Sequence, residues 1–165
     1  MKDAYRYRAN ATALVASGAF AGCNLFIGLS IGGFWLSLEP EEFKAVFGQQ
    51  FPRFLLTIMP LYLLTLLGLV QSAWLDWQHQ IIRRNWLIAI GLFAAITFIT
   101  LGYHVPENLR LLSSGYSEGQ AAASRPYWLI GHVPRIILAF GITIYALRAV
   151  VEYRDSEKPG VPRPD

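Results

Sequence analysis

The feature that most restricts the fold of this chain is a set of four long apolar runs. The hydrocarbon core of a bilayer is about 30 Å thick, and a helix that rises about 1.5 Å per residue needs about 20 apolar residues to cross it. Each run reaches this length or comes close to it, and 54% of the 165 residues are hydrophobic while only 15% are charged. The sequence therefore predicts an all-α fold, an integral membrane four-helix bundle with spans at about residues 11–38, 54–74, 86–103 and 127–151.

The runs are joined by short loops, and no segment repeats, so the sequence indicates one domain. We expect residues 1–153 to form the four-span transmembrane domain. Residues 154–165, "RDSEKPGVPRPD", are expected to be a flexible tail because they are polar and rich in proline. The first run is too long for a signal peptide and lacks a cleavage site, so we expect the mature protein to keep it.

Basic residues near the ends of the runs predict the orientation of the chain. They gather before the first run, between the second and third, and after the fourth, at Lys2, Arg6, Arg8, Arg83, Arg84, Arg148, Arg154 and Lys158. The positive-inside rule then makes both termini cytoplasmic, and the expected location is the bacterial inner membrane. The net charge of +3 follows from this topology and from contact with anionic lipid, so it gives no reason to expect a nucleic-acid partner.

Two ionisable side chains lie inside the beginning of the fourth run. His132 and Arg135 are three residues apart and share one face of a helix. A guanidinium in hydrocarbon costs at least about 2.5 kcal/mol, so Arg135 either extends to the outer headgroups or faces a polar cavity inside the bundle. In the second case the two residues form a buried site, and Pro134 would free backbone carbonyls beside it.

The third run ends in "GYHVPENLR", on the same side of the membrane as this pair. Pro106 is expected to end the helix near His104. Glu107 and Asn108 would then lie on a following turn, from which they can reach the His–Arg pair. Asn108 would orient His132 or bind a ligand oxygen, or else it would only cap the loop.

The first run carries a stripe of residues at near-helical spacing, Asn24, Gly28, Gly32 and Trp35. The amide of Asn24 would hydrogen-bond a ligand, the two glycines would leave space for it, and the ring of Trp35 would cover it. Such a stripe would suit a flat aromatic ligand. The glycines are equally explained by close packing of helices, because small residues let two backbones approach each other.

Metal and haem sites have weak support in the sequence. The single cysteine, Cys23, rules out an intramolecular disulfide, a zinc site built on cysteines and an iron–sulfur cluster. His104 and His132 would bind a haem from both sides, or an iron ion together with Glu107. Neither arrangement has a specific spacing, and Arg135 would oppose a cation, so we predict no metal and no cofactor, with haem or iron as the alternative.

At these residues the chain resembles the anthrone oxygenase family. The segment "VPENLR" at residues 105–110 is similar to a V-P-x-N-x-x-L-like turn, in which Leu109 or Leu111 supplies the leucine. Trp128, His132 and Arg135 form a W-x-x-x-H-x-x-R motif, from which Pro134 is a departure. With the glycine-rich first helix and the four spans, the resemblance covers about residues 11–151.

The resemblance implies an oxygenase that converts an anthrone to an anthraquinone with molecular oxygen and without an established organic cofactor. Asn108, His132 and Arg135 would be the catalytic residues. His132 would remove a proton to give an aromatic enolate, which can pass an electron to oxygen, and Arg135 would stabilise the anion with Asn108 or Asn24. The apolar aromatic substrate would be bound by Asn24, Gly28, Trp35, His104 and Trp128.

The alternative is a non-enzymatic bundle. It would be an accessory subunit of a larger membrane complex, or a protein that binds a quinone, a lipid or a haem. Its small size and aromatic content fit this class, and the chain would then form a homo-oligomer or join other subunits.

Overall fold

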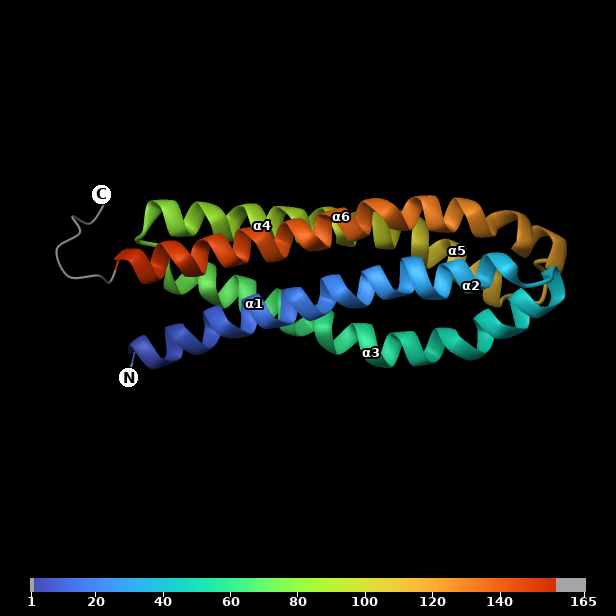
Figure 1. The fold of residues 1–165 in the computed structure, drawn as a ribbon, viewed down its shortest axis with the longest axis horizontal. Helices are drawn as coiled ribbons and strands as arrows, with labels where there is room; N and C mark the ends of the chain where they lie inside the picture. Colours follow the sequence, from blue (N-terminus) through green and yellow to red (C-terminus); the bar gives the residue numbers. More distant parts are fainter. Residues whose placement is uncertain (1, 157–165) are drawn as a thin grey trace.

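The computed structural model describes residues 2–156 and shows a bundle of long helices, with no strand in that range (Figure 1). Two short segments, η1 and η2, are π-helical. The elements, in chain order, are α1 (Lys2–Phe26), η1 (Ile27–Ile31), α2 (Gly32–Ser37), α3 (Pro40–Leu75), α4 (Gln80–Ile99), η2 (Thr100–His104), α5 (Val105–Leu112) and α6 (Glu118–Ser156).

The π-helical segments join their neighbours without a break, so the eight elements form four continuous helical rods. These are Ala4–Ser37, Pro40–Leu75, Gln80–Leu112 and Glu118–Asp155, and each is long and apolar enough to cross a membrane. The predicted all-helical fold with four potential spans is therefore confirmed. Each rod is longer than its predicted apolar run, because the helices continue into more polar sequence at their ends.

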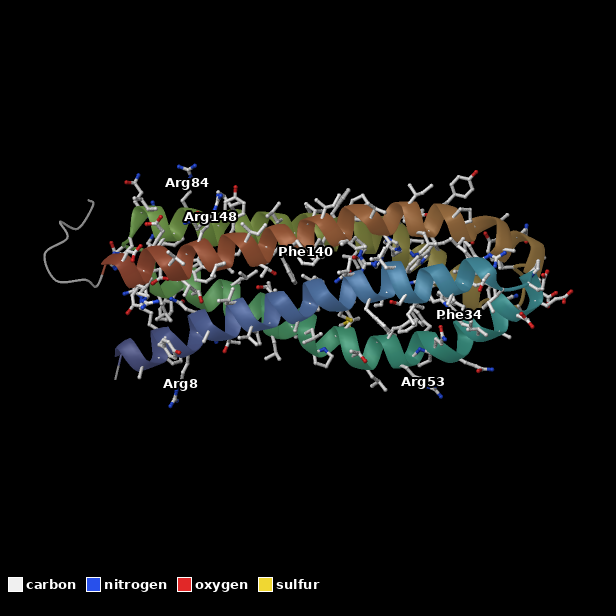
Figure 2. The ribbon with its side chains drawn as sticks, in the orientation of Figure 1. Arg8, Phe34, Arg53, Arg84, Phe140 and Arg148 are labelled. Carbon is white, nitrogen blue, oxygen red and sulfur yellow. The ribbon has the colours of Figure 1, made fainter. Side chains whose placement is uncertain are left out.

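The beginning of α1 and the end of α6 lie at the same end of the bundle (Figure 1). Figure 2 shows Arg8, Arg84 and Arg148 toward this end, and Arg53 toward the opposite one. The three regions that the positive-inside rule predicts on one side of the membrane thus each have an arginine toward one end of the bundle.

The structure corrects two predicted helix ends. The helix does not end near His104, because η2 leads directly into α5, where Pro106 lies in the first turn. The last helix runs to Ser156, so residues 154–156 of the predicted tail are helical, and residues 157–165 lie outside the described residues.

Two hydrophobic clusters fill the bundle. The cluster nearer the termini includes Phe20, Leu69, Trp86, Phe93 and Ile142. The cluster at the other end includes Trp35, Phe43, Phe47, Leu111 and Trp128. The candidate site described below lies where these two clusters meet.

A buried carboxylate that the sequence did not single out ties three rods together near the termini. Asp76 is fully buried and forms an ion pair with Arg6 of α1. It also accepts hydrogen bonds from Trp86 Nε1 at 2.7 Å and from Asn10 Nδ2 at 3.5 Å. Because a buried charge is tolerated only when it is paired and hydrogen-bonded, this cluster fixes the packing of α1 and α4 around the end of α3.

A close approach of two helices at Gly68 generates a prediction about stability. A Cβ at Gly68 of α3 would lie 2.7 Å from the backbone of Ala13 in α1, whereas a Cβ at Gly91 of α4 would have no neighbour within 4 Å. We expect Gly68→Ala to lower the free energy of unfolding by about 1–3 kcal/mol through overpacking. Gly91→Ala is the matched control and should be neutral or slightly stabilising, because alanine favours helix. Thermal unfolding in one detergent compares the two variants, and equal melting temperatures would contradict the close contact between α3 and α1.

Candidate functional site

A cavity of about 370 Å³ lies inside the bundle, bordered by residues of both hydrophobic clusters. This volume is within the range of about 300–1,000 Å³ that is typical of small-molecule sites. The walls are mainly aromatic and aliphatic, and the aromatic residues are Phe20, Trp35, Phe47, Phe51, Phe54, Tyr62 and Trp128. Such walls fit a flat apolar molecule.

Four residues with strongly polar side chains also line the cavity, from two neighbouring rods. His104 and Asn108 come from η2 and α5, and His132 and Arg135 come from α6. The two histidines are 0% and 1% exposed, and Arg135 is 7% exposed. The predicted catalytic residues His132, Arg135 and Asn108 thus face one cavity, and Arg135 does not extend to the surface of the protein.

His132 uses both of its ring nitrogens within the protein. Its Nε2 donates a hydrogen bond to the backbone carbonyl of Asn24 at 2.9 Å, so this nitrogen carries the proton. Its Nδ1 then has a free lone pair, which accepts a hydrogen bond from Arg135 Nη1 at 3.3 Å. The ring also stacks on Trp128, with centroids 5.0 Å apart and planes at 10°. His132 is therefore a neutral imidazole that holds α6 against the first rod.

Arg135 is a buried cation without an acidic partner. Its Nε is buried and makes no hydrogen bond, and no carboxylate of the described residues forms an ion pair with it. Glu107, which the sequence placed near the His–Arg pair, instead accepts from the hydroxyl of Tyr116 at 3.3 Å and from Arg110 Nη1 at 3.4 Å. A guanidinium in these surroundings favours an anion or a polar oxygen from a ligand.

His104 has the more available ring. Both of its nitrogens are buried without a hydrogen-bond partner, and the carbonyl of Gly131 lies near the ring outside hydrogen-bonding geometry. Its ring meets Trp128 edge to face, with centroids 4.9 Å apart, and it meets His132 in the same way at 5.7 Å. The sequence assigned this residue to substrate binding, but its free nitrogens also suit it for proton transfer.

Asn108 is partly buried on α5 and accepts a hydrogen bond from Trp128 Nε1 at 2.8 Å through its side-chain oxygen. It does not cap a loop, because it lies inside a helix that continues past it. The bond fixes the amide, so that its NH₂ group is left for other partners. Trp128 is held between this bond and the two histidine rings.

Two of the predicted substrate-binding residues, Asn24 and Gly28, do not line the cavity. A Cβ at Gly28 would lie 2.6 Å from Ile136 Cδ1 and 3.0 Å from His132 Cδ2, so α6 occupies the space that the glycine leaves. The side chain of Asn24 donates to the carbonyl of Phe20 at 2.9 Å. Gly28 therefore serves helix packing, and Asn24 contributes to the site through its backbone carbonyl, which accepts the hydrogen bond from His132.

The other predicted residue of this stripe, Trp35, does line the cavity. Its Nε1 donates to Gln50 at 2.9 Å, and its ring meets Trp128 edge to face with centroids 5.2 Å apart. The aromatic wall supplied by α3 was not predicted. A signal for it exists in the sequence, because Phe47, Phe51 and Phe54 recur at helical spacing.

The arrangement of the histidines does not favour a metal or a haem between them. A metal ligand needs a free nitrogen lone pair, and the lone pair of His132 faces the guanidinium of Arg135. A positive charge at this place also repels a metal cation. Within the described residues, no group of three His, Cys, Asp or Glu side chains could hold a metal ion.

Comparisons of the chain with protein-family models, with curated proteins and with solved structures find no match. The resemblance to anthrone oxygenases therefore stays a prediction, and the geometry of the cavity carries the functional argument.

The unpaired guanidinium predicts that the cavity prefers anionic ligands. Anthracene-2-carboxylate and its neutral methyl ester have the same flat tricyclic frame and differ in charge. We expect Arg135→Met to weaken binding of the carboxylate by about 10- to 100-fold, the value of one charge-assisted hydrogen bond of about 1.5–3 kcal/mol. The affinity for the ester should stay nearly constant.

Both affinities can be measured in detergent by energy transfer from tryptophan to anthracene. The methionine fills a similar volume, and it removes a buried charge, so the variant should fold. Equal losses for acid and ester would mean that Arg135 supports the shape of the cavity and does not select for charge.

Proposed function

We propose that the protein is a membrane-embedded oxygenase that oxidises an apolar polycyclic or phenolic substrate with molecular oxygen, through base-assisted formation of an enolate. One observation carries the proposal. A histidine with two unpartnered nitrogens, His104, and a cation without an acidic partner, Arg135, border the same buried and mainly apolar cavity. A base beside an anion-stabilising group is the arrangement that enolate chemistry requires.

The proposed setting is the bacterial inner membrane, with both termini in the cytoplasm. Four rods long and apolar enough to cross a membrane support it, as does the grouping of Arg8, Arg84 and Arg148 toward one end of the bundle (Figure 2). In this setting an apolar substrate reaches the protein dissolved in lipid.

The first step that we propose is removal of a proton from the substrate. A ring nitrogen of His104 takes a proton from the methylene that lies across the central ring from the ketone, and the electron pair of the broken C–H bond moves through the conjugated rings onto the ketone oxygen. Arg135 stabilises this enolate oxygen, and the NH₂ of Asn108 is a second donor. The base is thus His104, and His132 has a positioning role, because its Nδ1 holds the guanidinium and its Nε2 is bound to Asn24.

The second step is the reaction with oxygen. The enolate passes one electron to O₂, and the resulting superoxide and carbon radical combine to a peroxide anion on the former methylene carbon. The His104 imidazolium returns its proton to this anion, and the hydroperoxide loses water to leave a ketone. In sum, the CH₂ group and O₂ give C=O and H₂O. The electrons come from the substrate itself, so these steps call on no organic cofactor.

A second candidate is a non-enzymatic bundle that holds a quinone or a lipid, as an accessory subunit or in a homo-oligomer. It is favoured by the hydrogen bonds that Trp128 and Arg135 already give to Asn108 and His132, which satisfy part of the site without a ligand. Oxygen uptake separates the two candidates. An absorption spectrum of the purified protein before and after dithionite tests for haem, which would show a Soret band.

The proposal predicts unequal roles for the three histidines of the chain. We expect His104→Ala to lower the rate of oxygen uptake with an anthrone by about 10²- to 10⁴-fold, because it removes the base. Added imidazole should restore part of that rate, since the substitution leaves space in the cavity. His132→Ala should lower the rate less, through a displaced Arg135.

The matched control is His79→Ala, because His79 precedes α4 and does not line the cavity. Its rate should equal that of the unsubstituted protein. If His104→Ala kept near-normal turnover, His104 would not be the base, and if no histidine variant changed the rate, the enzymatic proposal would fail.

A further inference from the structure

Part of the cavity wall is made of residues that are also exposed on the outside of the bundle. Four apolar residues that line the cavity are also exposed on the outside of the bundle, Leu55 and Met59 on α3, Leu101 on η2 and Val105 on α5. Their exposed fractions run from 38% for Val105 to 63% for Leu101. The cavity is only partly enclosed. We place its opening where these exposed lining residues lie, between α3 and the η2–α5 segment, and we call this place the side opening.

The surface around the side opening is apolar. Leu56 on α3, Phe98 on α4 and Leu109 on α5 are all more than half exposed. These residues belong to rods that are long and apolar enough to cross a membrane. The side opening consequently faces the surface that lipid would cover, and not a surface suited to water.

Side chains close the cavity toward the end of the bundle at which α1 begins and α6 ends. Tyr62 packs on Phe93 with ring centroids 4.6 Å apart, and Phe20 packs on the same ring at 6.2 Å. The hydroxyl of Tyr62 is hydrogen-bonded to Thr97 Oγ1 at 2.8 Å.

The opposite end is closed as well. Trp35 meets Phe47 with centroids 5.3 Å apart and also packs against Phe43. Arg125 covers this group, because its Nη1 donates to the carbonyls of Trp35 and Leu38 at 2.6 Å each and its guanidinium lies over the ring of Phe43. A ligand that entered along the bundle axis would have to break these contacts, whereas a ligand that entered through the side opening would break none of them.

We infer that the cavity is loaded from the lipid phase through the side opening, and that its ligand is a lipophilic weak acid that enters in its neutral form. The inference rests on the proposed function only in that it concerns the same cavity. A charged molecule would lose its hydration at the apolar mouth, at a cost of several kcal/mol, while the neutral acid avoids this cost.

Inside the cavity the acid can ionise without a net change of charge. The O–H bond breaks, its proton binds a free nitrogen of His104, and the remaining anionic oxygen lies against Arg135. Phenols and the enols of aromatic ketones belong to this class of ligand. The free ring nitrogens of His104 and the guanidinium of Arg135, which has no acidic partner, thus form together a binding site for an acid.

The route is tested by binding kinetics in phosphatidylcholine nanodiscs with anthracene-2-carboxylic acid as the probe. We expect Leu101→Phe to lower both the association and the dissociation rate constant about tenfold, because the larger side chain must move aside at each passage. The dissociation constant should then change little. A purely structural effect would change the dissociation constant instead.

Two controls accompany this variant. Leu87→Phe introduces the same change at an exposed leucine of α4 that does not line the cavity, and it should leave both rates unchanged. Arg125→Ala loosens the cover at the end of the bundle and should not accelerate binding. Unchanged rates in Leu101→Phe, or faster binding in Arg125→Ala, would overturn the side route.

Proton uptake tests whether the bound ligand shares its proton with His104. The probe is ionised in water near neutral pH, so binding as an acid–His104 pair should take up about one proton for each molecule bound. Calorimetry in two buffers of different ionisation enthalpy measures this number, and His104→Gln should abolish the uptake. No uptake, or no binding of the probe by the unsubstituted protein, would overturn the inference. Binding with proton uptake but without oxygen consumption would instead overturn only the proposed oxygenase.

Discussion

The site depends on one buried cation and on the short chain of hydrogen bonds that holds it. Arg135 donates to Nδ1 of His132, and Nε2 of the same ring donates to the carbonyl of Asn24. This chain joins the fourth rod to the first, and Gly28 lets the two helices approach closely enough to form it. Since no described carboxylate neutralises the guanidinium, the cavity has one strong preference, for negative charge, in apolar surroundings where such charges interact strongly.

The remaining features of the cavity follow from how the rods are shaped around this cation. Both π-helical segments lie at the histidines of the site, because η2 ends at His104 and η1 includes Gly28, which packs against His132. Such segments are rare and often mark functional sites. Aromatic side chains close the two ends, while the exposed leucines of α3 and η2 leave one side open. A buried polar pair reached through an apolar mouth suits a lipid-soluble acid better than a water-soluble one.

Hydropathy and spacing predicted the four potential spans. The cost of placing a guanidinium in hydrocarbon left two positions open for Arg135, the outer headgroups or the interior of the bundle, and the structure places it and His132 in the interior. The sequence could not show which imidazole is free, because that depends on a bond between residues that are far apart in the chain. Nor could it show that Glu107 turns toward Tyr116, or that the helix continues through Pro106. The glycine stripe was ambiguous for a similar reason, since only the position of α6 decides what fills the space beside Gly28.

The most direct measurement is the absorption spectrum of 2-hydroxyanthraquinone bound to the protein, because the ionised form of this dye absorbs at longer wavelength than the neutral form. It should be recorded at a pH at which the dye is neutral in empty nanodiscs. The account predicts the spectrum of the ionised form in the unsubstituted protein and that of the neutral form in Arg135→Met. A bound dye that stays neutral in both proteins would contradict the claim that His104 and Arg135 together receive an acid.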